Sequence, residues 1–263
     1  MQVNQKERMK MKRKPFAKQF EKNANFQIKR LHDAIYRYGG SVSNKAKLYR
    51  YVSGKKQLGL MQPRALKPFA RVVKRHLEEC PFFYKGDKYP MFTFVADCDF
   101  GKSNWKMKCD ELQKQTKRLL KGHDYIARVC LDEFPRAKYF DEGTLMCWHV
   151  HGIFFKELSR WYTQKINQEV KATGYKIRPL VTKRFDCLID AVHYTFKMPF
   201  GGKVRYQKKD DTRGFRHTTL SLKAAYNTFM HLKDAKIYDF MFAGGKGKKV
   251  LNRILAEIKN EKA

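Results

Sequence analysis

The chain has 263 residues and carries 57 Lys and Arg against 25 Asp and Glu, a formal net charge of +32. Its hydrophobic fraction of 43%, with 20 Phe, 14 Tyr and 3 Trp, is too high for a disordered basic tail, so we expect one or two folded domains. No apolar run approaches the roughly 20 residues that cross a bilayer, and residues 1–15 contain no hydrophobic secretory segment, which argues against membrane insertion and secretion.

The charge and the cysteine content indicate the partner and the compartment. Unbalanced Lys and Arg side chains repel one another in a compact chain, so a polyanionic partner is expected. Nucleic acid is the first candidate. An anionic membrane surface is the second, but it requires a basic amphipathic helix with exposed large apolar side chains, which we do not find. The six cysteines lack close spacing and are predicted to be buried thiols in a reducing compartment.

Residues 1–90 are expected to form a basic helical region, with a domain boundary near Pro90. Apolar residues recur at helical spacing over residues 28–38 and again over residues 66–77. Residues 1–22 are so rich in Lys, Arg and Gln that a mobile arm is expected. The two helices either bind DNA or pack on the neighbouring domain with their basic faces in solvent, and the sequence leaves both possibilities open.

Residues 91–263 predict an α+β domain with a central antiparallel sheet and flanking helices, because strand and helix patterns alternate in it. The expected strands are residues 91–96, 125–131, 145–155 and 176–185, and the expected helices are residues 104–121, 157–173 and 186–198. A turn at residues 141–143 is expected to make the second and third strands antiparallel neighbours.

The segment His149-Val150-His151 lies inside the third expected strand. Because side chains alternate between the faces of a strand, both imidazoles lie on one face and make half of a metal site. Two partly buried structural histidines would have the same spacing, so a third ligand decides between the alternatives. The preceding strand ends at Asp132 and Glu133, and its alternation favours Asp132.

The helix expected at residues 186–198 carries a candidate nucleophile. Asp190, Tyr194 and Lys197 fall on one side of this helix, away from its apolar stripe. A tyrosine becomes a good nucleophile when a metal or a cation stabilises its phenolate, and Lys197 is one turn away. A second Tyr-x-x-Lys begins at Tyr206, but it lies in a Gly- and Lys-rich stretch predicted to be a loop, so Tyr194 is favoured.

The order of these features is more specific than any one of them. A strand of type Phe-Thr-Phe (residues 92–94), a helix and a strand ending in an acidic residue precede the strand HVHGIFF (residues 149–155). A helix with Tyr-x-x-Lys follows some forty residues later. In this order residues 91–200 resemble the HUH endonucleases, in particular the rolling-circle replication initiators of plasmids and single-stranded phages.

The resemblance implies an RRM-like sheet with the tyrosine helix over its metal-binding face. It implies a metal held by His149, His151 and either Asp132 or Glu133, a nucleophile at Tyr194 and an assisting lysine at Lys197. Two departures from the family pattern stand out. The segment of residues 134–146 is longer than the usual short hairpin, which leaves the third ligand open, and the nucleophile helix holds one tyrosine.

The activity implied by the resemblance is site-specific nicking of single-stranded or extruded origin DNA. The family chemistry uses Mg²⁺ or Mn²⁺, leaves a 5′-phosphotyrosyl enzyme and a 3′ hydroxyl primer, and can rejoin the ends. Host helicase and polymerase would be the partners, and the cytoplasm of a bacterial host would be the location.

Basic residues beyond the site are expected to contact DNA phosphates. They lie in a predicted loop at residues 201–217 and in a predicted tail run, GGKGKK, at residues 244–249, although both segments are also compatible with plain solvated loops. The candidate DNA-binding residues are Lys203, Arg205, Lys208, Lys209, Arg213, Lys246, Lys248 and Lys249.

Other functions remain open at this stage. Single-stranded-DNA transposases and conjugative relaxases share the metal chemistry, but the transposases are typically shorter, and the relaxases place the nucleophile ahead of the histidines. A non-catalytic nucleic-acid-binding protein with structural histidines is the alternative from a different class.

Overall fold

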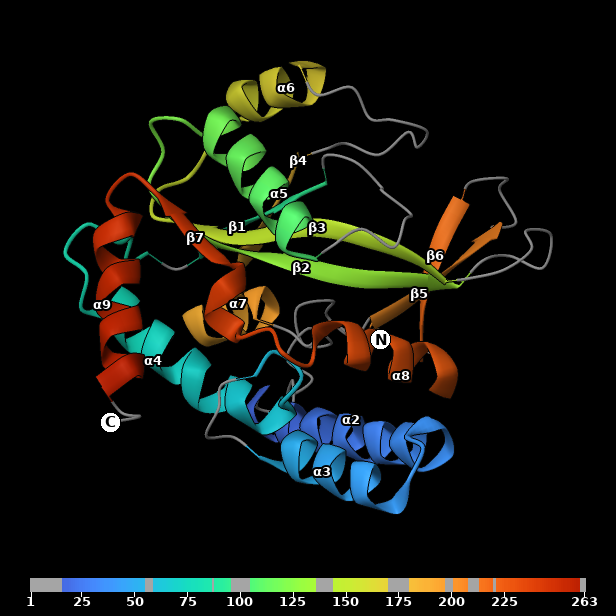
Figure 1. The fold of residues 1–263 in the computed structure, drawn as a ribbon. Coiled ribbons are helices and arrows are strands. Elements are labelled where there is room, and N and C mark those ends of the chain that lie inside the picture. The colour runs from blue at the N-terminus through green and yellow to red at the C-terminus, as the bar shows by residue number, and fades with distance from the viewer. Residues whose placement is uncertain are drawn as a thin grey trace, which may run out of the picture.

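The computed structural model describes residues 16–54, 59–86, 88–95, 105–135, 144–169, 180–196, 201–207, 213–219 and 221–260. For residues 16–23, 132–135, 144–147, 169, 201–207 and 213–219 it describes the backbone only. These residues form the α+β fold that the sequence predicts, a mainly antiparallel sheet flanked by α-helices (Figure 1). None of the described helices is both long enough and apolar enough to span a membrane.

Five strands form the antiparallel centre of the sheet. Their order across the sheet is β4 (Leu180–Phe185), β1 (Tyr89–Phe94), β3 (Thr144–Phe154), β2 (Tyr125–Pro135) and β7 (Met241–Gly244). The long strands β2 and β3 pair antiparallel along their whole length, as predicted, and the turn predicted at residues 141–143 lies outside the described residues. β4 lies at one edge, where it pairs with β1.

A two-stranded ribbon extends the sheet where the sequence predicted a basic loop. β5 (Gly201–Gln207) and β6 (Arg213–Thr219) pair antiparallel, and one parallel pair, Glu133 with Gly202, joins the ribbon to β2. The loop prediction was therefore wrong for residues 201–207 and 213–217, and residues 208–212 lie outside the described part of the chain. Val204, Tyr206 and Phe215 are good strand formers, and cross-strand pairing outweighs the Gly and Lys content of the segment.

Helices cover both faces of the sheet (Figure 1). One face carries α5 (Trp105–Leu119) and α6 (Arg160–Glu169), and the opposite face carries α4 (Leu66–Glu78), α7 (Leu188–Thr195) and α9 (Gly247–Asn260). The helices α2 (Phe16–Tyr38), α3 (Val42–Ser53) and α8 (Leu222–Leu232) pack together beyond this second layer. Two short 3₁₀ helices, Pro63–Ala65 and Ile237–Phe240, connect neighbouring elements.

The alternation of β3 divides its side chains between two hydrophobic cores, as a strand buried on both faces requires. Trp148, Val150 and Phe154 belong to the core that includes α5. Ile153 belongs to the core that includes α4, α7 and α9. The histidines of β3 have the same parity as Ile153, so they lie on the face that α7 covers.

The N-terminal helices are built into these cores. Ile28, Leu31 and Ile35 of α2 share a core with Phe229 of α8, and the α4 residues share the other core with α7 and α9. The chain around Pro90 is part of β1, so residues on both sides of the expected domain boundary contribute to the same two cores.

Residues 16–22 of the predicted mobile arm belong to a helix, because α2 runs from Phe16 without a break to Tyr38. Residues 1–15 lie outside the described part of the chain.

Candidate metal and nucleophile site

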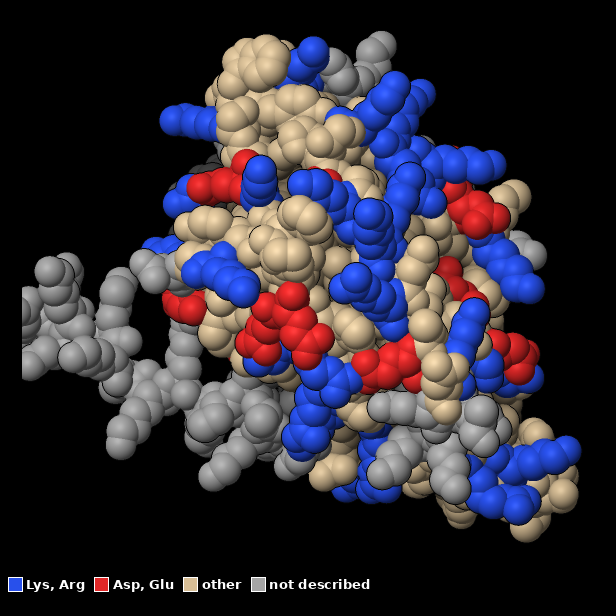
Figure 2. Space-filling model, turned by 90° about the vertical axis from the view of Figure 1, so that its left-hand side faces the viewer, with Lys and Arg blue, Asp and Glu red and all other residues tan. Residues whose placement is uncertain are grey.

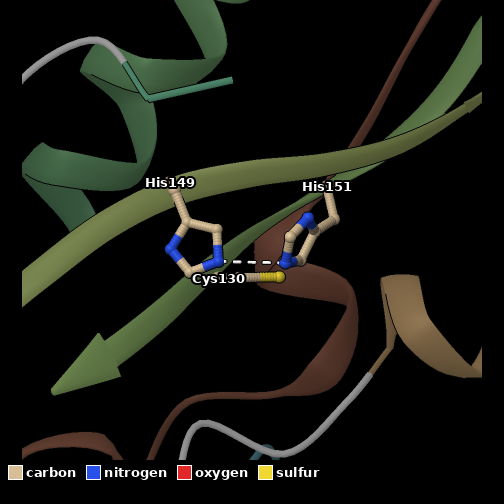
Figure 3. A group of neighbouring side chains, drawn as sticks. All are labelled: Cys130, His149 and His151. Atoms are coloured by element: carbon tan, nitrogen blue, oxygen red, sulfur yellow. Dashed lines mark hydrogen bonds between the residues drawn. The ribbon is translucent and has the colours of Figure 1, made fainter. Parts of the chain in front are cut away.

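Three side chains that can bind a metal ion meet on the face of the sheet that α7 covers, and Figure 3 shows how they lie. His149 and His151 come from β3, and Cys130 comes from β2, where it pairs directly with His149. The two Nε2 atoms lie 3.0 Å apart, and the three ligand atoms lie within 4.8 Å of one another. All three residues are buried. The group is therefore suited to hold a metal ion.

The third strand of this region orients one of the imidazoles. Thr93 of β1 pairs with His151, and its Oγ1 lies 2.9 Å from Nδ1 of that histidine. When Thr93 accepts a hydrogen bond from Nδ1–H, the Nε2 atom of His151 presents its lone pair toward His149. Outer hydrogen bonds of this kind fix the tautomer and the direction of metal-binding histidines.

Cys130 is enclosed by α7 and lies near a buried cation. Its Sγ is 3.6 Å from the carbonyl oxygen of Thr195, at the end of α7. Arg128, two residues earlier on β2, is buried, and its guanidinium lies 6.0 Å from the centre of the Phe196 ring. Burial lowers the pKa of Arg128, and negative charge on Cys130 and Cys109 acts in the opposite direction. A thiolate at Cys130, which is the form that binds metals, would thus be attracted to this guanidinium.

Tyr194 on α7 lies beside the histidine pair. Its ring centre is 4.8 Å from that of His151 and 5.5 Å from that of Phe185. The Lys183 ammonium of β4 lies 5.5 Å from the centre of the same ring. The tyrosine is partly exposed, whereas the histidines are buried. A candidate nucleophile, a candidate metal group and a cation thus adjoin one another.

Cys130 is the residue of this group that we did not predict. Its signal was present in the sequence, since the strand alternation that favoured Asp132 also places Cys130 on the same face. For the predicted acids the backbone is described: Asp132 pairs with Cys147, and Glu133 pairs with Met146 and with Gly202. Their side chains lie outside the described part of the chain.

The other predicted site residues divide between described and undescribed segments. Lys197, Lys208 and Lys209 lie outside the described residues. Lys203 and Arg205 lie on β5 and Arg213 on β6, where the backbone alone is described.

We expected the GGKGKK run to be a loop in the tail, but it forms the turn from β7 into α9. Gly245 in this turn has a φ of 51°, where a side chain is disfavoured. Lys248 and Lys249 are exposed in the first turn of α9, and the Lys246 ammonium lies 4.0 Å from the centre of the Phe82 ring. Figure 2 shows the side of the molecule on which α9 lies, and Lys and Arg are spread widely over it.

One further histidine lies close to the site. His193 of α7 is buried, and this burial lowers its pKa to about 4. Asp190 on the same helix acts to raise that pKa, while Lys67 and Arg71 on the packed helix α4 lower it further. The imidazole of His193 is therefore neutral at physiological pH.

Comparisons with protein-family models, with curated proteins and with solved structures found no match for this chain.

Proposed function

We propose that this protein is a metal-dependent nickase of the HUH type that initiates replication on single-stranded or extruded origin DNA. The observation that supports the proposal most is the position of Tyr194, whose ring centre lies 4.8 Å from that of His151. The pairing of β2, β3 and β1 brings together the potential ligands and their orienting threonine, and α7 adds the phenol. Of these residues, the sequence resemblance calls for His149, His151 and Tyr194, and it calls for an acid where the structure has Cys130.

The potential ligands suit some metals better than others. Imidazole nitrogens and a thiolate suit a borderline transition metal, whereas Mg²⁺ prefers oxygen ligands. Of the two family ions, Mn²⁺ tolerates nitrogen and sulfur ligands better than Mg²⁺ does, so we propose Mn²⁺ for Cys130, His149 and His151, with Mg²⁺ in the cell where Asp132 contributes a carboxylate. Without an oxygen ligand, the Cys–His–His set favours Zn²⁺ over both ions. A bound ion would act as a Lewis acid that stabilises charge on the oxygens of the scissile phosphate.

The chain's own residues carry the proposed transfer. The Tyr194 oxygen attacks phosphorus, loses its proton and forms a bond to the phosphate on the 5′ side. The 3′ oxygen of the preceding nucleotide leaves and takes up a proton, which gives the 3′ hydroxyl. Lys183, together with Lys197 in the role that the resemblance gives it, would stabilise the developing phenolate. The phosphotyrosyl bond conserves the energy of the diester, so the ends can be rejoined without ATP.

The substrate would be unpaired at the point of attack, because a phenol on a helix that covers the site cannot reach the backbone of an intact duplex. The net charge of +32 supports binding to phosphates. Lys203, Arg205, Arg213, Lys246, Lys248 and Lys249 remain candidates for these contacts. Host helicase and polymerase would act on the nicked product.

A covalent-capture experiment tests the proposal without knowledge of the origin sequence. Single-stranded oligonucleotides with a randomised centre are incubated with protein and Mn²⁺ or Mg²⁺ and separated on a denaturing gel. We expect a protein adduct that retains the label from the 3′ end, and a released fragment with a free 3′ hydroxyl. Sequencing of the captured strands then gives the preferred site.

Tyr194→Phe is the matched variant, because it keeps the ring contacts with His151 and Phe185 and removes the hydroxyl. We expect it to form no adduct while binding DNA as the wild type does. If the wild type formed no adduct with either metal, a non-catalytic nucleic-acid-binding protein would be favoured. Full activity in Tyr194→Phe would move the nucleophile to another tyrosine, such as Tyr206.

A further inference from the structure

A groove runs along the outer edge of the sheet, between α6 and β4. It consists of two adjoining cavities of about 940 Å³ and about 330 Å³, which share Pro90, Glu157 and Arg184 in their linings. The larger cavity extends along α6 past Arg160, and the smaller one extends toward Tyr84. We call the two together the edge groove.

The walls of the edge groove are fixed in place. Asn167 of α6 donates a hydrogen bond to the carbonyl oxygen of Leu180 at 3.0 Å and accepts one from the amide of the same residue at 2.8 Å. This two-point contact holds α6 against the start of β4. The strand itself pairs with β1 along its whole length. A ligand would therefore meet a preformed groove, which lowers the entropic cost of binding.

The lining of the edge groove is positively charged. Four basic residues contribute to it, namely Lys88, Arg160, Lys183 and Arg184, against one acid, Glu157. The four basic side chains are exposed, and Glu157 forms an ion pair with Arg184. The cations are distributed along both cavities, as repeated contacts with a phosphate backbone require.

Exposed aromatic rings accompany this charge. Tyr84 lines the smaller cavity and is 49% exposed. Trp161 lies next to Arg160 on α6 but outside the lining of both cavities; it is 67% exposed and has the Lys165 ammonium 5.6 Å from its ring centre. Aromatic rings beside cations bind unpaired bases by stacking, which the paired bases of a duplex cannot offer. The combination therefore favours a single strand over a duplex.

The edge groove is also connected to the candidate site through β4. Successive residues of this strand point to opposite faces. Arg184 contributes to the groove, and Lys183, which also lines it, approaches the Tyr194 ring on the other face. A chain that lies in the edge groove can therefore pass over β4 toward Tyr194.

We propose that the edge groove binds a single-stranded nucleic acid segment, with its phosphates on Lys88, Arg160 and Arg184. The part of this inference that places the segment beside the phosphate attacked by Tyr194 rests on the proposed function. Binding of a single strand in the edge groove is independent of the proposed function.

The test is the affinity of the full chain for a fluorescent oligothymidine, measured by anisotropy over a range of salt concentrations. The groove variant combines Lys88→Gln, Arg160→Gln and Arg184→Gln. The control variant removes the same number of exposed charges elsewhere, with Lys47→Gln on α3 and with Arg253→Gln and Lys259→Gln on α9.

We expect the groove variant to bind at least about ten-fold more weakly than the control, with a shallower salt dependence. Each lost contact to a single strand lowers the log–log salt slope by about 0.7, so three lost contacts lower it by about 2. Equal losses in the two variants, or none in the groove variant, would overturn the proposal. Equal binding of a duplex competitor by the wild type would overturn the preference for a single strand.

A second variant guards against a folding defect, because Arg184→Gln removes an ion pair. Gln164→Glu with Gln168→Glu places two carboxylates on exposed positions of α6 that line the larger cavity. This variant should also weaken oligothymidine binding at least about ten-fold, and unchanged binding would contradict the groove. If the wild type formed no covalent adduct while both groove variants bound oligothymidine more weakly, the nickase proposal would be disproved. The proposal that the edge groove binds a single strand would still hold.

Discussion

Oγ1 of Thr93 lies 2.9 Å from Nδ1 of His151, so a side chain of β1 sets the direction of an imidazole on β3. Thr93→Val removes this hydrogen bond and keeps the shape of the side chain. We expect metal affinity to fall by about ten- to hundred-fold, because outer partners of this kind orient metal-binding histidines. Isothermal titration with Mn²⁺ measures the change.

Thr116→Val is the control for this substitution. Thr116 is buried whereas Thr93 is partly buried, and the Thr116 hydroxyl donates to the carbonyl oxygen of Leu112 within α5. Each variant should lose about 1 kcal/mol of stability, while the control should keep its metal affinity. Equal metal affinities in the two variants would rule out an orienting role for Thr93.

The histidine pair should be required for cleavage and dispensable for binding. His149→Ala removes one imidazole of the candidate metal group without altering the lysines and arginines that we propose as phosphate contacts. We expect adduct formation to fall by at least about a thousand-fold, with oligothymidine affinity within about two-fold of the wild type. His231→Ala on α8 serves as a matched histidine control. Retained cleavage in His149→Ala would show that the pair is structural.

Cys130 should determine which metal is preferred. Cys130→Asp replaces a sulfur ligand with an oxygen ligand, close to the buried Arg128 guanidinium. We therefore expect the Mg²⁺ concentration needed for half-saturation to fall toward the Mn²⁺ concentration needed for it. Cys130→Ala should weaken Mn²⁺ binding by about ten-fold or more. Cys109→Ala, at a buried cysteine on α5, is the control. Unchanged Mn²⁺ affinity in Cys130→Ala would point to Asp132 as the third ligand.

The sequence predicted the part of the fold that carries the site. Period-two and helical patterns predicted β1, α5, β2, β3, α6, β4 and α7, with ends displaced by a few residues. The face shared by His149 and His151 followed from strand alternation alone. Helix α9 was missed although Val250, Ile254 and Ile258 have helical spacing, because the basic run before it was taken for a tail.

Other features depended on tertiary pairing, so strand alternation gave the face on which Cys130 lies but not its position beside the histidines. Cys130 lies beside the histidines because β2 and β3 pair with Cys130 opposite His149, and register is set by turns and packing rather than by local sequence. The edge groove has the same origin, since it requires the contact of Asn167 with Leu180, thirteen residues away. Long-range partners of this kind leave no periodic signal.

His193 should make stability depend on pH. Burial holds its folded-state pKa near 4, below the ordinary value of 6.5. Between these values the unfolded chain binds a proton that the folded chain does not, so the free energy of unfolding falls as the pH drops through this window. At about 1.4 kcal/mol per pKa unit, the loss is of order 3 kcal/mol by pH 4.

His193→Gln should remove this part of the pH dependence. Urea unfolding of the variant and the wild type near pH 6.5 and near pH 4 measures the difference, because the other titrating groups are common to both. Asp190, Lys67 and Arg71, which surround the imidazole, stay in place. Parallel stability curves for the two proteins would show that His193 titrates normally in the fold.

Gly152, directly after the histidine pair, should tolerate no side chain. It pairs with Phe92 of β1 and with Ala127 of β2, in the middle of the sheet. A Cβ built on Gly152 would overlap the ring of Phe92 and lie 3.0 Å from the Cβ of Ala127. Phe92 is fully buried, and its ring packs on Phe154 with a centre-to-centre distance of 4.5 Å, so it has little space to move.

Gly152→Ala should therefore cost about 1–3 kcal/mol of unfolding free energy, the usual range for overpacking in a core. Because the strain lies on the face opposite the histidines, metal affinity should fall less than in Thr93→Val. Phe92→Leu combined with Gly152→Ala should recover part of the loss, since the smaller side chain makes room for the new methyl group. Urea unfolding of the single and double variants gives the coupling between the two positions. Strictly additive losses would mean that the glycine is needed for some reason other than the Phe92 ring.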